Sequence, residues 1–69
     1  MDWTRFQNRL RSLRKKKGVS ASTVSELIGN ERSSVSAYER GRRRPSVVTL
    51  QKLADYFEVS VDYLLGLKD

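Results

Sequence analysis

The sequence predicts an all-α fold of five short helices joined by tight turns. Three observations lead to this prediction. Apolar residues recur at intervals of three and four along most of the chain. Residues suited to helix capping stand directly before these apolar segments, and no alternating run of β-branched and apolar residues is long enough for a strand. With 69 residues, the chain has room for one small domain, expected over 1–69.

The first helix is expected between a capping residue at Asp2 and a terminating glycine at Gly18. The basic run Arg14–Lys17 precedes that glycine, where positive charge suits the negative end of the helix dipole. The apolar face of this helix consists of residues spaced by three and four: Trp3, Phe6, Leu10 and Leu13. We expect Trp3 to cover the core rather than to stack on bases.

The second helix is expected to begin after Ser20, which has the side chain of an N-cap residue. Val19 and Val24 occupy the two positions of a hydrophobic staple around that cap. Leu27 and Ile28 continue the apolar face, and Gly29 is expected to close the helix.

The third helix is expected to start near Asn30 or Glu31, to cover about residues 31–40 and to end at Gly41. Val35 and Tyr38 are its inward-facing pair. A short helix, a turn of about three residues containing glycine and a second short helix together form the pattern of a helix-turn-helix. Many helical hairpins share this spacing, so the pattern alone does not decide between them.

Two further helices complete the prediction. Pro45 and Ser46 open the fourth, whose inward residues are Leu50, Leu53, Ala54 and Phe57. Ser60 caps the fifth, which carries Val61, Leu64 and Leu65 and ends at Gly66.

The charge of the chain is placed unevenly. The net charge is +6 and the pI is about 10.2. Residues 1–44 carry twelve Lys and Arg against four acids, whereas residues 45–69 carry two against four. This asymmetry predicts a polyanionic partner, most often nucleic acid, for the N-terminal two-thirds.

Composition argues against several other classes of protein. The chain has no Cys and no His, so a disulfide, a thiolate metal site and a histidine general base are all excluded. Its acids are scattered over different helices and it lacks a glycine-rich phosphate loop, so neither an enzyme nor a bound cofactor is expected. The polar N-terminal segment does not resemble a signal peptide, and no apolar run approaches a membrane span. A cytoplasmic setting is expected.

The outer face of the third predicted helix carries little bulk. Helical spacing places five residues there: Arg32, Ser33, Ser36, Ala37 and Arg40. Helices that face only water usually carry longer side chains with better helix propensity than serine. A small, hydroxyl-rich face flanked by arginines suits the major groove of DNA, where both residue types can contact base edges. The alternative, a face that is merely solvated, stays open at this point.

The chain resembles the phage repressor and Cro (Xre-type) helix-turn-helix DNA-binding family over Arg9–Gly66, about 58 residues. The resemblance rests on three segments, RLRSLRKKKGVS (9–20), GNERSSVSAYERGRRRPS (29–46) and LQKLADYFEVSVDYLLG (50–66). It implies a five-helix lambda-repressor-like domain that regulates transcription, as a repressor bound to a palindromic operator as a homodimer. The second and third helices would form the helix-turn-helix, with the third in the major groove.

The resemblance also implies roles for individual residues. Base contacts fall to Arg32, Ser33, Ser36 and Ala37. Phosphate contacts fall to Ser20, Ser22, Ser34, Arg40, Arg42, Arg43 and Arg44. Arg14 and Glu39 match a structural ion pair that ties the first helix to the end of the third.

Partners other than DNA follow from the same resemblance. The family commonly pairs around its last helix, so Val61, Tyr63, Leu65 and Leu67 are candidates for a dimer interface, although Val61 and Leu65 could equally complete the core. The main alternative is an antitoxin of the same fold that binds both its operator and a toxin protein. A toxin or an anti-repressor protein is therefore a further conceivable partner.

Overall fold

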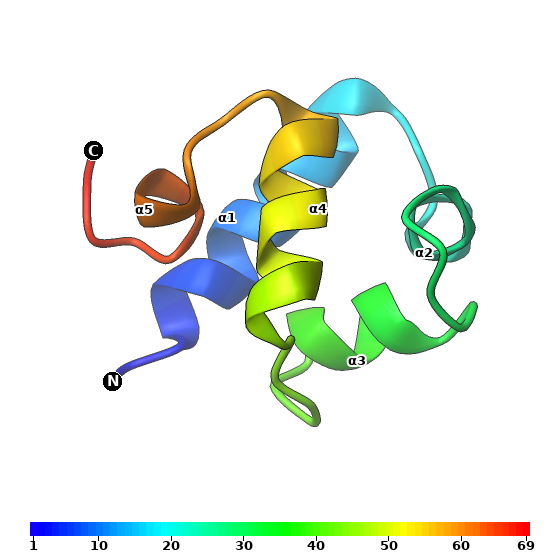
Figure 1. Ribbon diagram of the computed structural model, residues 1–69, viewed down its shortest axis with the longest axis horizontal. Coiled ribbons are helices and arrows are strands. Elements are labelled where there is room, and N and C mark those ends of the chain that lie inside the picture. Colours follow the sequence, from blue (N-terminus) through cyan, green and yellow to red (C-terminus); the bar gives the residue numbers. More distant parts are fainter.

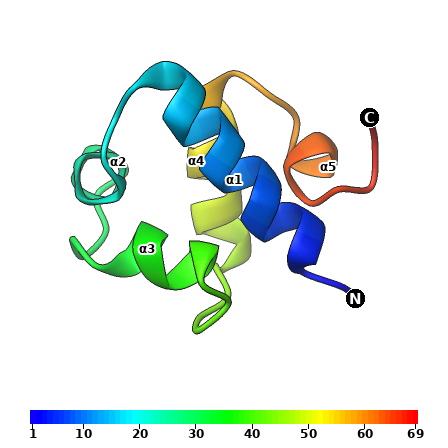
Figure 2. The same cartoon turned by 180° about the vertical axis from the view of Figure 1, so that it is seen from behind.

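The computed structural model describes all 69 residues and measures 27 × 23 × 20 Å. It confirms the predicted all-α class with five helices and no strand: α1 (Thr4–Lys17), α2 (Ala21–Leu27), α3 (Ser34–Glu39), α4 (Val47–Phe57) and α5 (Val61–Leu64). α1 and α4 cross in the centre of both views, α2 and α3 form one end, and α5 lies at the other end with both termini (Figures 1 and 2). None of these helices has the length and apolar character needed to cross a membrane.

Serine side chains begin three of the five helices, as the sequence predicts. The hydroxyl oxygen of each accepts a hydrogen bond from the backbone N–H three residues further along: Ser20 from Thr23 (3.1 Å), Ser46 from Thr49 (3.1 Å) and Ser60 from Tyr63 (3.0 Å). Each bond satisfies one of the N–H groups that a helix leaves without an internal partner. At the start of α1, the carboxylate of Asp2 accepts from Thr4 N–H at 2.9 Å.

The first helix ends where a glycine can take a conformation that other residues avoid. Gly18 has φ +74°, in the left-handed region, and its N–H donates to the carbonyl oxygens of Arg14 and Lys15. A residue with a side chain would be strained at this φ. Because glycine has none, the helix can end here at little conformational cost. The predicted end of this helix is confirmed.

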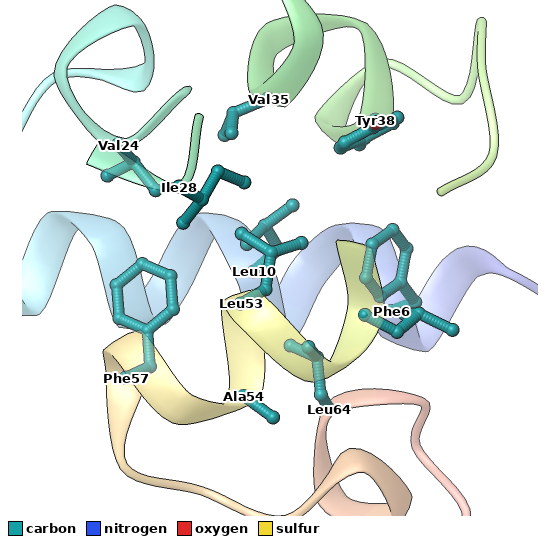
Figure 3. Close-up of a cluster of buried hydrophobic side chains, with 11 residues drawn as sticks. Phe6, Leu10, Val24, Ile28, Val35, Tyr38, Leu53, Ala54, Phe57 and Leu64 are labelled. Carbon is teal, nitrogen blue, oxygen red and sulfur yellow. The ribbon is translucent and has the colours of Figure 1, made fainter. Parts of the chain in front are cut away.

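Every helix contributes to one apolar core (Figure 3). Its buried members are Phe6, Leu10, Val24, Ile28, Val35, Tyr38, Leu50, Leu53, Ala54, Phe57 and Leu64. Trp3 packs on the edge of this cluster, with its ring 5.5 Å from that of Phe6 in an edge-to-face arrangement. This position agrees with the expected role of Trp3 as a cover for the core.

The expected start of the third helix is wrong. α3 begins at Ser34, three residues after Glu31, and the turn after α2 therefore covers residues 28–33. The chain makes a separate turn first, in which Ser34 N–H donates to the carbonyl of Glu31 at 3.0 Å. As a result, Arg32 and Ser33 stand in the turn before α3 and not within the helix.

Ser25 explains why α3 can start so late. This residue is buried in α2, and its hydroxyl oxygen accepts a hydrogen bond from Val35 N–H at 3.0 Å while donating to the carbonyl of Ala21 at 2.8 Å. Val35 is the second residue of α3, so its N–H has no partner inside the helix. The cap of α3 is thus supplied by the preceding helix rather than by Ser33, whose side chain makes no capping bond.

The C-terminal turn is held against α1 by two arginines. Arg5 donates to the carbonyl oxygen of Gly66 at 3.0 Å, and Arg9 donates to the carbonyl oxygens of Tyr63 and Lys68. Gly66 allows this approach because a Cβ atom there would lie 2.4 Å from Cβ of Arg5. Arg5 and Arg9 therefore hold the C-terminal turn in place against α1.

Replacing Ser25 with Ala should destabilise the protein by about 1–3 kcal/mol, since Val35 N–H would lose its partner in a buried position. The free energy of unfolding from urea titration measures this effect. Ser12→Ala is the matched control, because Ser12 is exposed in α1 and Ala is the better helix former. Equal stability of the two variants would show that Val35 N–H does not depend on Ser25.

Candidate nucleic-acid interface

The outer side of α3 continues into a loop of arginines, and together they form what we call the α3 surface: Arg32, Ser33, Ser36, Ala37, Arg40, Arg42, Arg43 and Arg44. All five arginines and Ser33 are exposed, while Ser36 and Ala37 are half-buried. The loop after α3 projects beyond the helix at the bottom of Figure 1. Small residues thus lie at the centre of the surface and long cationic side chains around it.

One residue expected on this surface is not there. Ser34, predicted to contact a phosphate, is only 2% exposed. It is the first residue of α3, and the late start of the helix turns its side chain toward the interior of the domain. The Ser34 side chain is therefore not available to contact a phosphate.

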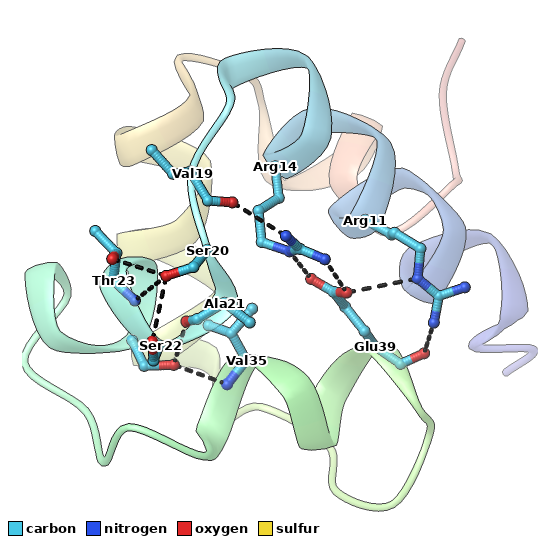
Figure 4. A network of polar contacts seen from close by, with 10 residues as sticks. Arg11, Arg14, Val19, Ser20, Ala21, Ser22, Thr23, Val35 and Glu39 are labelled. Atoms are coloured by element: carbon cyan, nitrogen blue, oxygen red, sulfur yellow. Dashed lines mark hydrogen bonds and ion pairs between the residues drawn. The ribbon is translucent and has the colours of Figure 1, made fainter.

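Behind the α3 surface lies the ion pair predicted between α1 and α3 (Figure 4). Nε of Arg14 lies 2.6 Å from one carboxylate oxygen of Glu39, and Nη2 donates to the other at 3.0 Å. The Glu39 side chain is 5% exposed and that of Arg14 17% exposed. The hydrogen bonds to Glu39 raise the pKa of Arg14 above its ordinary value, although partial burial acts in the opposite direction.

Two more contacts extend this ion pair into a network. Arg14 also donates to the carbonyl of Val19 at 3.0 Å, which fixes the chain just before the cap of α2. Arg11 lies 3.5 Å from the Glu39 carboxylate and donates to the Glu39 carbonyl at 3.2 Å. A single buried carboxylate thereby connects α1, the start of α2 and the end of α3.

A polar pocket of about 320 Å³ opens beside this network. It is lined by Arg11, Arg14, Lys15, Ala21, Ser36, Glu39 and Arg40. Four cations and one neutralised acid give it a positive character suited to an anionic group. The sequence analysis did not single out Arg11 and Lys15, although Arg11 lies three residues before Arg14 and four before Lys15, the spacings at which side chains are neighbours on a helix.

The start of α2 borders the same pocket. The hydroxyl of Ser20 is occupied by capping, and it lies 3.2 Å from that of Ser22. The N–H groups of Ala21 and Ser22 donate to no acceptor within the protein, as expected for the first turn of a helix. Of these residues Ala21 lines the pocket, together with the exposed cation Arg40 at the end of α3.

The residues expected at a dimer interface lie at the far end of the molecule, around α5. Val61 and Leu65 are half-buried and pack against the core, so part of their apolar surface is already used. The ring of Tyr63 lies 4.3 Å below the guanidinium carbon of Arg9. Only Leu67, at 67% exposure, offers a large free apolar side chain among these four.

These features define a class of protein. Two short helices joined by a fixed turn present a basic surface with little central bulk, which is the construction of a helix-turn-helix module. A family model described as helix-turn-helix (HTH_3) matches residues 10–64. The chain belongs to this family.

Individual relatives agree with this assignment. The chain is 46% identical, over 86% of its length, to the HTH-type transcriptional regulator AnsR of Bacillus subtilis, of which it covers 51%. The chain thus spans about half the length of the curated relatives it matches. These relatives are named as transcriptional regulators, and the antitoxin alternative is not favoured.

Solved structures show the same fold. The restriction-modification controller protein C.AhdI from Aeromonas hydrophila is 41% identical, with a TM-score of 0.82 over 91% of this chain and 96% of that one. The P22 c2 repressor, crystallised with a synthetic operator, is 27% identical, with a TM-score of 0.81 over 86% of this chain and 89% of that one.

Replacing Glu39 with Gln should destabilise the protein by about 3 kcal/mol, because Arg14 would keep a largely buried positive charge without a counter-ion. Chemical denaturation measures the loss. The control is Glu31→Gln, which removes the same charge from an exposed residue without an ion pair and should change stability by less than about 0.5 kcal/mol. The network would be of no structural importance if both variants unfolded at the same denaturant concentration.

Proposed function

We propose that this chain binds double-stranded DNA through the α3 surface and regulates transcription as a repressor. The observation that carries the proposal is the α3 surface itself: five exposed arginines surround serine and alanine side chains on one end of the domain. The low bulk allows α3 and the preceding turn to approach the floor of the major groove. The P22 c2 repressor, whose structure was solved with an operator, has the same fold.

The surface divides into residues that read bases and residues that bind phosphates. Arg32, Ser33, Ser36 and Ala37 form the reading part, in which Arg32 alone can make the bidentate contact with guanine that proteins use most often. Arg40 and the loop arginines 42–44 flank it and bind the phosphate backbone, together with Ser20 and Ser22 at the start of α2. The pocket adds Arg11 and Lys15 to the phosphate-binding group.

A contact between Arg44 and Trp3 supports the assignment of the arginine loop to phosphate binding. The guanidinium carbon of Arg44 lies 5.5 Å from the centre of the Trp3 ring, which is a cation–π distance. This contact brings the basic loop back against the start of α1. The loop is therefore oriented relative to α3 before DNA arrives, which lowers the entropy lost on binding.

The operator is proposed to be palindromic and the binding unit a homodimer. One helix-turn-helix reads only a few base pairs, and two-fold related copies reach half-sites about 34–36 Å apart on one face of the duplex. The end of the chain around Val61, Tyr63, Leu65 and Leu67 is the proposed contact between copies. Because only Leu67 is largely free, this contact alone is small, and simultaneous DNA binding would help to hold the dimer together.

Arg32→Ala should remove information at one base pair of each half-site. Selection of bound sequences from a random duplex library would give a two-fold symmetric motif for the unaltered protein. The variant should select the same motif with one symmetric pair of positions degenerate, since one guanine contact is worth about 1–3 kcal/mol. Failure of the unaltered protein to enrich any motif at moderate salt would contradict the proposed function.

Replacing Arg42, Arg43 and Arg44 together with Ala should weaken all duplexes alike. Each lost phosphate contact reduces the dependence of log K on log salt by about 0.9, so the slope should fall by nearly three per subunit. Fluorescence anisotropy over a range of salt concentrations gives both quantities. Lys52→Ala/Lys68→Ala serves as a control that removes two charges outside the α3 surface, and a selective loss for one sequence would argue against phosphate binding by the loop.

A further inference from the structure

One exposed acid stands directly beside the proposed reading residues. Glu26 lies in the last turn of α2, and one of its carboxylate oxygens is 2.9 Å from Nε of Arg32. The two side chains are 56% and 77% exposed, respectively. No other arginine of the α3 surface has an acidic partner in the structure. Arg32 therefore differs from the arginines assigned to phosphates in having an acidic partner.

The position of Glu26 places its charge on the DNA-facing side of α2. Ser22 and Glu26 are four residues apart on this helix and so share one face. Ser22 belongs to the proposed phosphate contacts at the start of α2. A negative charge one helical turn away from such a contact opposes the binding of any polyanion, so Glu26 is not explained by affinity for DNA.

The geometry of the ion pair leaves Arg32 able to read a base. The closest contact of the ion pair is at Nε, and the two terminal amino groups, Nη1 and Nη2, form no hydrogen bond within the protein. These two groups form one edge of the planar guanidinium and can donate in parallel to O6 and N7 of guanine. A guanine contact through this edge can coexist with the ion pair.

Binding of Arg32 to a phosphate is affected differently. A phosphate close to the guanidinium would also lie close to the Glu26 carboxylate, and the two anions repel each other. The ion pair also restricts a side chain that would otherwise sample many rotamers and reach neighbouring phosphates. The carboxylate therefore disfavours non-specific contacts more than the guanine contact.

From these observations we infer that Glu26 is a specificity-determining positioning residue, which directs Arg32 toward a guanine edge and withholds it from the phosphate backbone. This inference rests on the proposed function, in which Arg32 reads a base. An exposed ion pair contributes up to about 1 kcal/mol, which is a factor of about five in an equilibrium constant. The effect expected is accordingly on the ratio of specific to non-specific affinity and not on folding.

The test measures the affinity of the 69-residue chain for two probes: the duplex selected from the random library, and the same duplex with the base pair assigned to Arg32 changed. In Glu26→Gln, affinity for the changed duplex should rise more than affinity for the selected one, so that their ratio falls about two- to five-fold. Glu26→Asp should restore part of the ratio. In an Arg32→Ala background, Glu26→Gln should leave the ratio unchanged.

Glu31→Gln is the matched control. Glu31 is also an exposed acid, and it lies next to Arg32 in the turn between α2 and α3, but it forms no ion pair with Arg32. This variant should alter both affinities equally. If Glu26→Gln does the same, Glu26 is only a surface charge and the inference is overturned. A loss of affinity for the selected duplex that persists without Arg32 would also overturn it, because Glu26 would then contact a base itself.

These outcomes separate the inference from the proposed function. If Arg32→Ala changes the ratio and Glu26→Gln does not, the DNA-binding assignment stands and the role of Glu26 is refuted. If Arg32→Ala leaves the ratio unchanged, Arg32 reads no base and the inference fails together with that assignment. Absence of binding to any duplex would refute both.

Discussion

The arrangement of this small domain depends on one buried carboxylate. Glu39 ends α3, yet its side chain turns inward to meet Arg14 and Arg11 of α1. A carboxylate with 5% exposure is costly to bury unless its oxygens are paired, and here both accept from one guanidinium. Arg14 also donates a hydrogen bond to the carbonyl oxygen of Val19, just before α2. The angle between α1 and α3, and the point where α2 starts, are set by the same group of atoms.

That connection has a consequence for the outer surface. α3 has only six residues and would not form a stable helix by itself. Its two ends are held from outside, by Ser25 of α2 at the start and by the arginines of α1 at the end. The stability of α3 therefore does not depend on its outward-facing side chains, and these can be small.

Much of this organisation could be predicted from the sequence, because it is local. A serine before an apolar segment and a glycine after a basic run specify helix ends through atoms only a few residues apart, and Ser20, Ser46, Ser60 and Gly18 behave as expected. The Arg14–Glu39 pair came from the family resemblance rather than from local rules. The start of α3 does not follow from local rules, because its cap comes from Ser25, ten residues away from Val35. The Glu26–Arg32 contact depends on how the turn folds back on α2, which no periodicity describes.

The hydrogen bonds from Arg5 and Arg9 to the C-terminal turn determine the side of the domain from which a group attached to a terminus would project. They bring the last residues back to the first turns of α1, and both termini lie on the flank beside α5, away from α2 (Figures 1 and 2). A fluorophore, an affinity tag or a second domain attached at either end would project from that flank. An attachment at the C-terminus would leave the arginine loop and α3 uncovered, whereas an attachment at the N-terminus would begin two residues from Trp3, whose ring contacts Arg44 of that loop.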